Sequence, residues 1–243
     1  MKKFLFILFF SILLITNSAY AGDFVSGLVA HYEFEGNTND SSANNYTLQT
    51  AGTKAYTNGI LGQAYVFNGT DNNLSAFGTA LSDVNGTIAY WINTNANTTR
   101  FLVSLGSSSN TAETYINGSS FIANGINDQN FSNTVDINDS KWHHVAVTFA
   151  DANTTNVYID GSLVAIDSSS GDDLNLATNI YVGHKMGSFQ YADKIDDIRI
   201  YKRALTSADI ASLYSYRPAK LLLESYGGVL QFDGNNSYVD LGS

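Results

Sequence analysis

The segment 195–205, with the sequence IDDIRIYKRAL, places two adjacent carboxylates before an alternating run that leads toward a helix start. Ile198 and Ile200 fall on one face of this run, whereas Asp197 and Arg199 fall on the other. This alternation is the pattern of a half-buried β-strand. Because the apolar face of such a strand must be covered, the segment requires a partner sheet.

Short alternating runs recur along the chain and are separated by clusters of Asn, Gly, Asp and Ser, as expected for antiparallel strands joined by turns. The clearest runs are 28–35, 64–67, 87–92, 142–149, 156–159 and 162–165. Asp160 and Gly161 suit a two-residue hairpin turn because both tolerate a positive φ. The content of 13% aromatic and 14% charged residues, with a single proline, also favours an all-β fold.

One short helix is expected after the last alternating run. Thr206 can cap this helix, and Asp209 stands three positions later, as in a capping box. Ile210, Leu213 and Tyr214 then share one helical face. We therefore predict a structural helix near the C-terminal end.

Residues 1–21 have the three zones of a secretory signal peptide. Lys2 and Lys3 precede the apolar run Phe4–Thr16, and small residues end the segment at Ala21. The apolar run is short for a bilayer span, which takes about 20 residues, so we expect cleavage rather than membrane insertion. The mature chain is then predicted to begin at Gly22 and to be secreted or displayed at the cell surface.

Charge and cysteine content narrow the possible partners and the sources of stability. Loss of two lysines with the signal peptide changes the formal net charge from −10 to −12, which disfavours nucleic acid and anionic membranes as partners. The chain has no cysteine, so an exported domain has no disulfides and depends on buried area, with bound ions as a possible aid. About 220 mature residues are enough for one domain with a sizeable core.

Four separated blocks occur in the order typical of laminin-G-like jelly rolls of the concanavalin A-like lectin/glucanase family. They are 27–37, 62–69, 142–147 with 158–161, and the segment 195–205. The chain resembles this family over residues 22–217. The resemblance implies an all-β, two-sheet antiparallel jelly-roll sandwich with about six or seven strands in each sheet and functional variation in the rim loops.

The C-terminal tail contains an internal echo of the first domain. Residues 227–243 repeat the pattern of 62–79, in which Phe-Asx-Gly is followed by a polar spacer and a short strand. We therefore interpret 218–226 as a linker and 227–243 as the truncated start of a second similar domain within a larger surface protein. The alternative is an unrelated β-prone tail that docks on the first domain.

The resemblance also implies a structural Ca²⁺ site, because jelly rolls of this kind commonly join a carboxylate before the last strand to backbone carbonyls. Carried over to this sequence, the ligands would be Asp196 and the carbonyls of Phe34 and Gly69. Asp197 is expected to be solvated charge. Asp40 is a second oxygen-rich candidate, but its Asn- and Ser-rich loop also fits an Asx turn.

The sequence gives little support to catalysis. His143 and His144 are adjacent in a strand and point to opposite faces, so they cannot readily hold one metal ion. A glycosidase needs two carboxylates across the scissile bond. Jelly-roll glucanases usually carry a Glu-Asp-Glu alternation on one strand, which is absent here. Glu33 and Glu35 share a strand face but lack the third acid, and the remaining Glu residues, Glu113 and Glu224, are isolated.

The segment 183–192 is the best candidate for a ligand-binding rim loop, with His184, Lys185, Gln190 and Tyr191 as contact residues. The alternative is that its aromatic side chains fill the edge of the sandwich. We predict an exported, non-catalytic binding module for a glycan or a surface or matrix protein. A structural spacer of an adhesin-like protein is the second interpretation, and a glycoside hydrolase is the third.

Overall fold

The structure is a computed structural model that describes most of the chain between Phe24 and Ser225. The described residues are 24–81, 85–107, 110–118, 120–124, 131–133, 136–151, 154–167, 177–185, 187 and 190–225. The predicted signal peptide, 1–21, and the predicted start of a second domain, 227–243, lie outside these residues.

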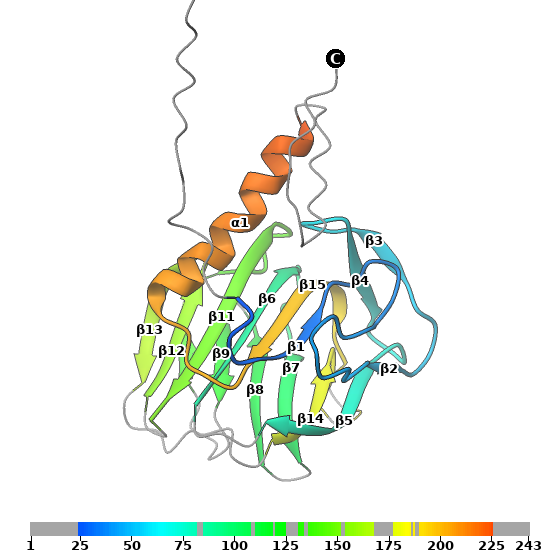
Figure 1. Ribbon diagram of the computed structural model, residues 1–243. Helices are drawn as coiled ribbons and strands as arrows, with labels where there is room; N and C mark the ends of the chain where they lie inside the picture. The colour runs from blue at the N-terminus through cyan, green and yellow to red at the C-terminus, as the bar shows by residue number, and fades with distance from the viewer. Residues whose placement is uncertain are drawn as a thin grey trace, which may run out of the picture.

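Two antiparallel sheets form a sandwich, which confirms the predicted jelly-roll architecture (Figure 1). The larger sheet has eight described strands in the order β13 (Ser162–Asp167), β12 (Thr154–Ile159), β11 (Trp142–Ala150), β6 (Gly86–Asn93), β15 (Ala192–Tyr201), β4 (Gln63–Asn68) and β3 (Tyr56–Asn58), with β1 (Leu28–Tyr32) also paired to β15. The smaller sheet has seven described strands in the order β10 (Phe131–Asn133), β9 (Ser120–Asn124), β8 (Asn110–Asn117), β7 (Arg100–Ser107), β14 (Ala177–Val182), β5 (Leu74–Leu81) and β2 (Gln49–Thr50).

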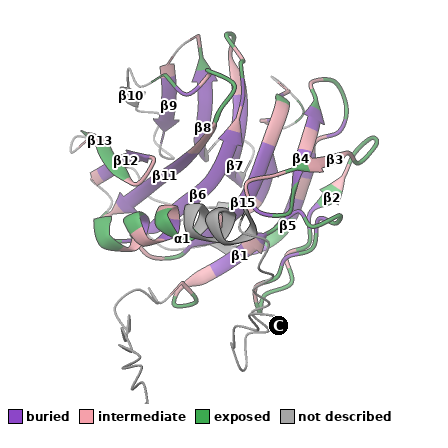
Figure 2. Ribbon diagram, turned by 90° about the horizontal axis from the view of Figure 1, so that it is seen from above, coloured by how far each residue is buried: buried purple, intermediate pink, exposed green. Residues whose placement is uncertain are grey.

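The core lies between the two sheets and is built from alternate residues of each strand. Ile88 and Tyr90 of β6 belong to the same buried cluster as Val103 and Leu105 of β7. The Tyr90 hydroxyl donates a hydrogen bond to the Thr114 hydroxyl of the opposite sheet at 2.9 Å. The central strands of both sheets are coloured as largely buried in Figure 2.

The helix α1 (Ser207–Ser225) covers part of the outer face of the larger sheet (Figures 1 and 2). The predicted capping box is present, because the Asp209 amide donates to the Thr206 hydroxyl at 3.1 Å and the Thr206 amide donates to the Asp209 carboxylate at 3.0 Å. Ile210 and Leu213 pack into a second buried cluster on this face with residues that include Tyr201.

The helix extends further than the sequence suggested. It has 19 residues and continues to Ser225, through most of the segment 218–226 that we interpreted as a linker. Pro218 favours a helix end in sequence-based reasoning, since it lacks an N–H donor and restricts the residue before it. No helix among the described residues is long and apolar enough to cross a membrane.

Replacing Ile210 by Ala tests whether α1 docking contributes to the stability of the sandwich. The Ile210 side chain is completely buried, so we expect Ile210→Ala to lower the free energy of unfolding by about 2–5 kcal/mol. Ser215 is exposed on the same helix, and Ser215→Ala should change stability by no more than about 0.5 kcal/mol. Urea unfolding monitored by circular dichroism measures both values, and equal small effects would contradict the docking.

Candidate functional site

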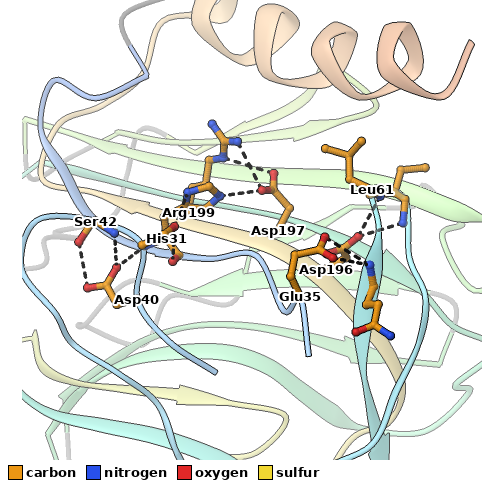
Figure 3. A network of polar contacts seen from close by, with 11 residues as sticks. His31, Glu35, Asp40, Ser42, Leu61, Asp196, Asp197 and Arg199 are labelled. Atoms are coloured by element: carbon orange, nitrogen blue, oxygen red, sulfur yellow. Dashed lines mark hydrogen bonds and ion pairs between the residues drawn. The ribbon is translucent and has the colours of Figure 1, made fainter. Parts of the chain in front are cut away.

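The structure has two polar regions with the chemistry of a functional site, and the first is the junction at Asp196 and Asp197. One edge of β15 pairs with β4 along Ala192–Ile195 and with β1 along Ile198–Tyr201. The register on the other edge of β15, against β6, shifts between Asp196 and Arg199, and Asp197 has a φ of 49°. The two carboxylates therefore stand where the strand changes its neighbour (Figure 3).

Asp196 fastens the turn between β3 and β4 onto β15. Its Oδ2 accepts hydrogen bonds from the amides of Ile60 and Leu61 at 2.9 and 3.3 Å. Gly59 makes this approach possible, because a Cβ atom at that position would lie 2.5 Å from the same oxygen. Only 1% of Asp196 is exposed, so these hydrogen bonds form away from water, where an unmade bond is costly.

Asp197 joins β15 to β1, which corrects the expectation that it is solvated charge. One of its oxygens lies 2.8 Å from His31 Nε2, and the other lies 3.3 Å from Arg199 Nε. The residue is buried. In a regular strand, successive side chains point to opposite faces. The register shift between Asp196 and Arg199 is a bulge that breaks this alternation, so the sequence pattern could not predict the placement of Asp197.

Asp40 has the turn role that its sequence context suggested as the alternative to metal binding. Its Oδ1 accepts hydrogen bonds from the amides of His31 and Ser42 at 2.9 and 2.8 Å, and its Oδ2 accepts one from the Tyr46 amide at 2.8 Å. The carboxylate thereby holds its own loop against β1.

The three predicted calcium ligands do not converge in the described structure. Gly69 follows Asn68, which pairs with Ala192, whereas Asp196 lies four residues further along β15, or about 13 Å. The Phe34 carbonyl accepts a hydrogen bond from the Gly36 amide at 2.8 Å. Among the described residues there is no group of three or more His, Cys, Asp or Glu side chains that could hold a metal ion. A calcium site that includes the Gly69 carbonyl as a ligand does not fit this geometry. Calcium binding by this protein therefore stays a prediction from the family resemblance.

The two adjacent histidines have different surroundings, as their positions in a strand predict. His144 is buried on the outer face of the larger sheet, with its ring 5.3 Å from that of Trp91. The ring nitrogens of His143 lie 2.8 Å from Asp160 and 3.1 Å from Asp139. Burial alone lowers the pKa of His143, but the hydrogen bonds to Asp160 and Asp139 outweigh it and raise the pKa above 6.5.

The predicted ligand residues of the segment 183–192 are separated by burial. Tyr191 is fully buried, and its hydroxyl donates to the Asn93 carbonyl at 3.3 Å. His184 is also buried, with Nε2 placed 3.2 Å from the Leu74 carbonyl, and burial lowers its pKa. These two side chains have no surface for a ligand in this structure and fill the sandwich edge instead. Gln190 is half-exposed, and Lys185 reaches a second polar region.

The second region lies on the outer face of the smaller sheet. The strand registers place Ser75, Tyr181, Ser104, Glu113 and Asn124 opposite one another in a row that crosses β5, β14, β7, β8 and β9. Their sequence neighbours Ala76, Val182 and Ala112 belong to the core between the sheets. The row therefore faces away from the core.

Glu113 and Lys185 form the charged pair of this face. The ammonium of Lys185 lies 2.7 Å from Glu113 Oε2, and Asn124 Nδ2 donates to Glu113 Oε1 at 3.3 Å. The Lys185 side chain is 34% exposed, whereas the Glu113 side chain is 5% exposed. The ammonium also lies 5.3 Å from the centre of the Phe101 ring, so the lysine covers both an acid and an aromatic ring.

An exposed aromatic ring stands beside this row. Phe77 is 57% exposed, and its ring meets that of Tyr181 edge-on at 6.2 Å. Asn179 Nδ2 donates to the Tyr181 hydroxyl at 3.2 Å. We call the surface formed by Phe77, Ser75, Asn179, Tyr181, Lys185 and Glu113 the outer-face patch.

Sequence reasoning named Lys185 but missed the rest of the outer-face patch. Glu113 has no acidic neighbour in the sequence and meets Lys185 only through the pairing of β8, β7 and β14. The alternation Leu74, Ser75, Ala76, Phe77 was a usable signal, since it places Phe77 on the polar side of its strand.

The fold and the patch define a jelly-roll protein with an aromatic and polar sheet face. The family model described as the concanavalin A-like lectin/glucanases superfamily matches residues 67–211, more than half of the 243 residues. The chain belongs to this family. A comparison with curated protein sequences gives no significant match.

Three solved structures illustrate the shared fold. Domain 4 of the extracellular arabinanase AbnA from Geobacillus stearothermophilus, in complex with arabinotriose, is 20% identical, with a TM-score of 0.66 over 77% of this chain and 98% of that one. The binding domain of botulinum neurotoxin DC in complex with rat synaptotagmin II is 15% identical, with a TM-score of 0.65 over 80% of this chain and 52% of that one. A structure of botulinum neurotoxin type C, whose cell entry depends on two ganglioside molecules, gives 14% identity and a TM-score of 0.66 over 80% and 52%. The chain thus spans about half the length of the toxin structures.

Replacing Asp196 by Ala tests its role as an acceptor for the β3–β4 turn. We expect Asp196→Ala to lower the free energy of unfolding by about 1–3 kcal/mol, because it leaves two amides unpaired. Asp196→Asn keeps one acceptor oxygen and should cost less. Both losses should be the same in EDTA and in added CaCl₂. A loss that appears only with calcium would instead assign Asp196 to a metal site.

The raised pKa of His143 predicts a pH-dependent stability. A group whose pKa is raised on folding contributes stability that is fully present below its unfolded pKa, about 6.5, and lost as the pH rises through the folded pKa. Wild-type protein should therefore lose stability relative to His143→Gln as the pH rises above about 6.5. Urea unfolding across this range measures the difference, and a constant difference would rule out the titration.

Proposed function

We propose that this protein is an exported, non-catalytic carbohydrate-binding module whose glycan site is the outer-face patch. The observation that carries the proposal is the exposed Phe77 ring, which meets the Tyr181 ring on the outer face of the smaller sheet beside the half-exposed Ser75 and Asn179. Export rests on the predicted signal peptide.

The chemistry of the patch suits a sugar. The apolar face of a pyranose or furanose ring packs on an aromatic ring, while its hydroxyls need donors and acceptors at the rim of the contact. Phe77 supplies the ring, and Ser75 and Asn179 are half-exposed beside it. Because these groups project from paired strands, they are positioned before the ligand arrives.

The comparisons support a binding module of this general kind. The arabinanase domain is in complex with arabinotriose, and the toxin structures concern a ganglioside-dependent entry and a complex with a protein receptor. The arabinanase domain is covered almost completely by this chain. It therefore favours a glycan over a protein as the partner, because the similarity to the toxins covers only half of their length.

The charge content of the sheet favours binding over hydrolysis. Retaining and inverting glycosidases place two carboxylates about 5–9.5 Å apart across the scissile bond. The seven described strands of the smaller sheet contain one acidic residue, Glu113, and its oxygens contact Lys185 and Asn124. The patch therefore has no second acid on its own strands to complete a catalytic pair.

A structural spacer in a longer adhesin-like surface protein is the second candidate. It is favoured by the echo of residues 62–79 in 227–243, which we interpret as the start of another domain. A spacer would need the sandwich but not the patch, so the two candidates are separated by a variant of the patch alone.

Replacing Phe77 by Ala tests the glycan site. Because the exposed ring supplies the stacking surface, we expect Phe77→Ala to weaken binding at least about fivefold. Titration calorimetry with the tightest ligand from a glycan array measures the loss. Thermal unfolding should change little.

Leu163 provides the matched control, since it is 46% exposed on the other sheet. Leu163→Ala should bind the same ligand as tightly as wild type. No ligand at high protein concentration on the array would favour the spacer, and unchanged affinity of Phe77→Ala would place the site elsewhere.

A further inference from the structure

The outer-face patch has an unusual charge distribution. Between residues 55 and 184 the sequence contains only one arginine, Arg100, and one lysine, Lys141. Arg100 is the first residue of β7, where its guanidinium donates to the Thr99 carbonyl at 2.8 Å. Lys141 precedes β11 of the other sheet and pairs with Asp139. The cation of the patch is Lys185, which follows β14, and its ammonium lies against Glu113 of β8 and Phe101 of β7, on the same sheet face as Phe77 of β5.

The charge of Lys185 is already matched by an acid. Glu113 is almost completely buried, and its carboxylate lies 2.7 Å from the ammonium. Withdrawing the lysine toward a ligand would leave a buried carboxylate without its cation, which is far more costly than breaking an exposed ion pair. Lys185 is therefore held for Glu113 and is not available to neutralise an acidic ligand.

We infer that the outer-face patch selects neutral glycans and rejects sialylated, uronate and sulfated ones, and that Glu113 is the residue that sets this selectivity. The inference rests on the proposed glycan-binding function and deepens it. An acidic sugar would meet a patch whose cation is committed to Glu113, on a protein with a formal net charge of −10. A neutral sugar needs only the Phe77 ring and the polar groups beside it.

The selectivity can be inverted by removing the charge of Glu113. Glu113→Gln keeps the shape of the side chain and leaves the Lys185 ammonium without its carboxylate. We expect this variant to bind anionic glycans about two- to fivefold more tightly than wild type, the range of one exposed ion pair. The gain should disappear at 1 M salt, where charges are screened within about 3 Å. Binding of neutral glycans should change less.

The matched control is the double variant Glu113→Gln with Lys185→Gln, which removes both charges and should lose the gain. The experiment uses an array that carries each oligosaccharide in a neutral form and in a sialylated or uronate form, with thermal unfolding to confirm that each variant is folded. Wild-type preference for the neutral member, with a salt-dependent gain for acidic members in Glu113→Gln alone, supports the inference. If the wild-type protein binds the neutral and acidic forms equally tightly, the selectivity is wrong but the glycan site stands. The same conclusion follows if folded Glu113→Gln binds acidic forms no more tightly than wild type. No glycan binding at all would overturn both.

Discussion

The structure depends on how β15 is shared by two neighbours along one edge. A single strand pairs with β4 over its first half and with β1 over its second half, while β6 runs along its other edge. The change of neighbour interrupts the ladder of backbone hydrogen bonds. At this point Asp196 accepts a hydrogen bond from the β3–β4 turn, and Asp197 contacts His31 of β1. These buried carboxylates replace ladder hydrogen bonds with charge-assisted ones, which are roughly twice as strong as neutral ones. Segments about 135 and 166 residues apart in the sequence are thereby joined at one point.

This junction lies on the outer face of the larger sheet, the side that α1 also covers, whereas the outer-face patch lies on the smaller sheet. The outer face of the larger sheet carries buried aromatic residues such as Trp91, which stacks on Tyr214 of the helix. The outer face of the smaller sheet exposes Phe77 instead. The contacts that hold the fold and the proposed glycan site therefore lie on opposite sides of the sandwich. Changes in the patch need not disturb the contacts that hold the fold, which is how one jelly roll can present different binding chemistry.

The sequence predicted the fold better than the site, and particular residues show why. Alternating runs and the capping box at Thr206 depend on near neighbours in the chain, so the strands and the start of α1 were predictable. The end of α1 was not, because Pro218 suggested a boundary that the helix passes. The burial of Asp197 follows from a bulge, and that of Tyr191 follows from packing between sheets. Glu113 meets Lys185 through a strand order that connects residues 72 positions apart, and no local pattern contains that information.

The Glu113–Lys185 pair adds little to stability and fits the proposed recognition role better. A half-exposed ion pair contributes about 0–1 kcal/mol, and burying one of its members adds a desolvation cost that an apolar pair would avoid. The neighbouring cluster of Phe101, Tyr115 and Ile122 shows that apolar side chains pack well on this same face. A charged pair at such a position therefore gains little for folding. What it does supply is a neutralised cation on the same sheet face as the exposed Phe77 ring, three strands away from it. Under the proposed function such a surface prefers neutral to charged ligands, and this preference follows from the ion pair rather than from the jelly-roll fold.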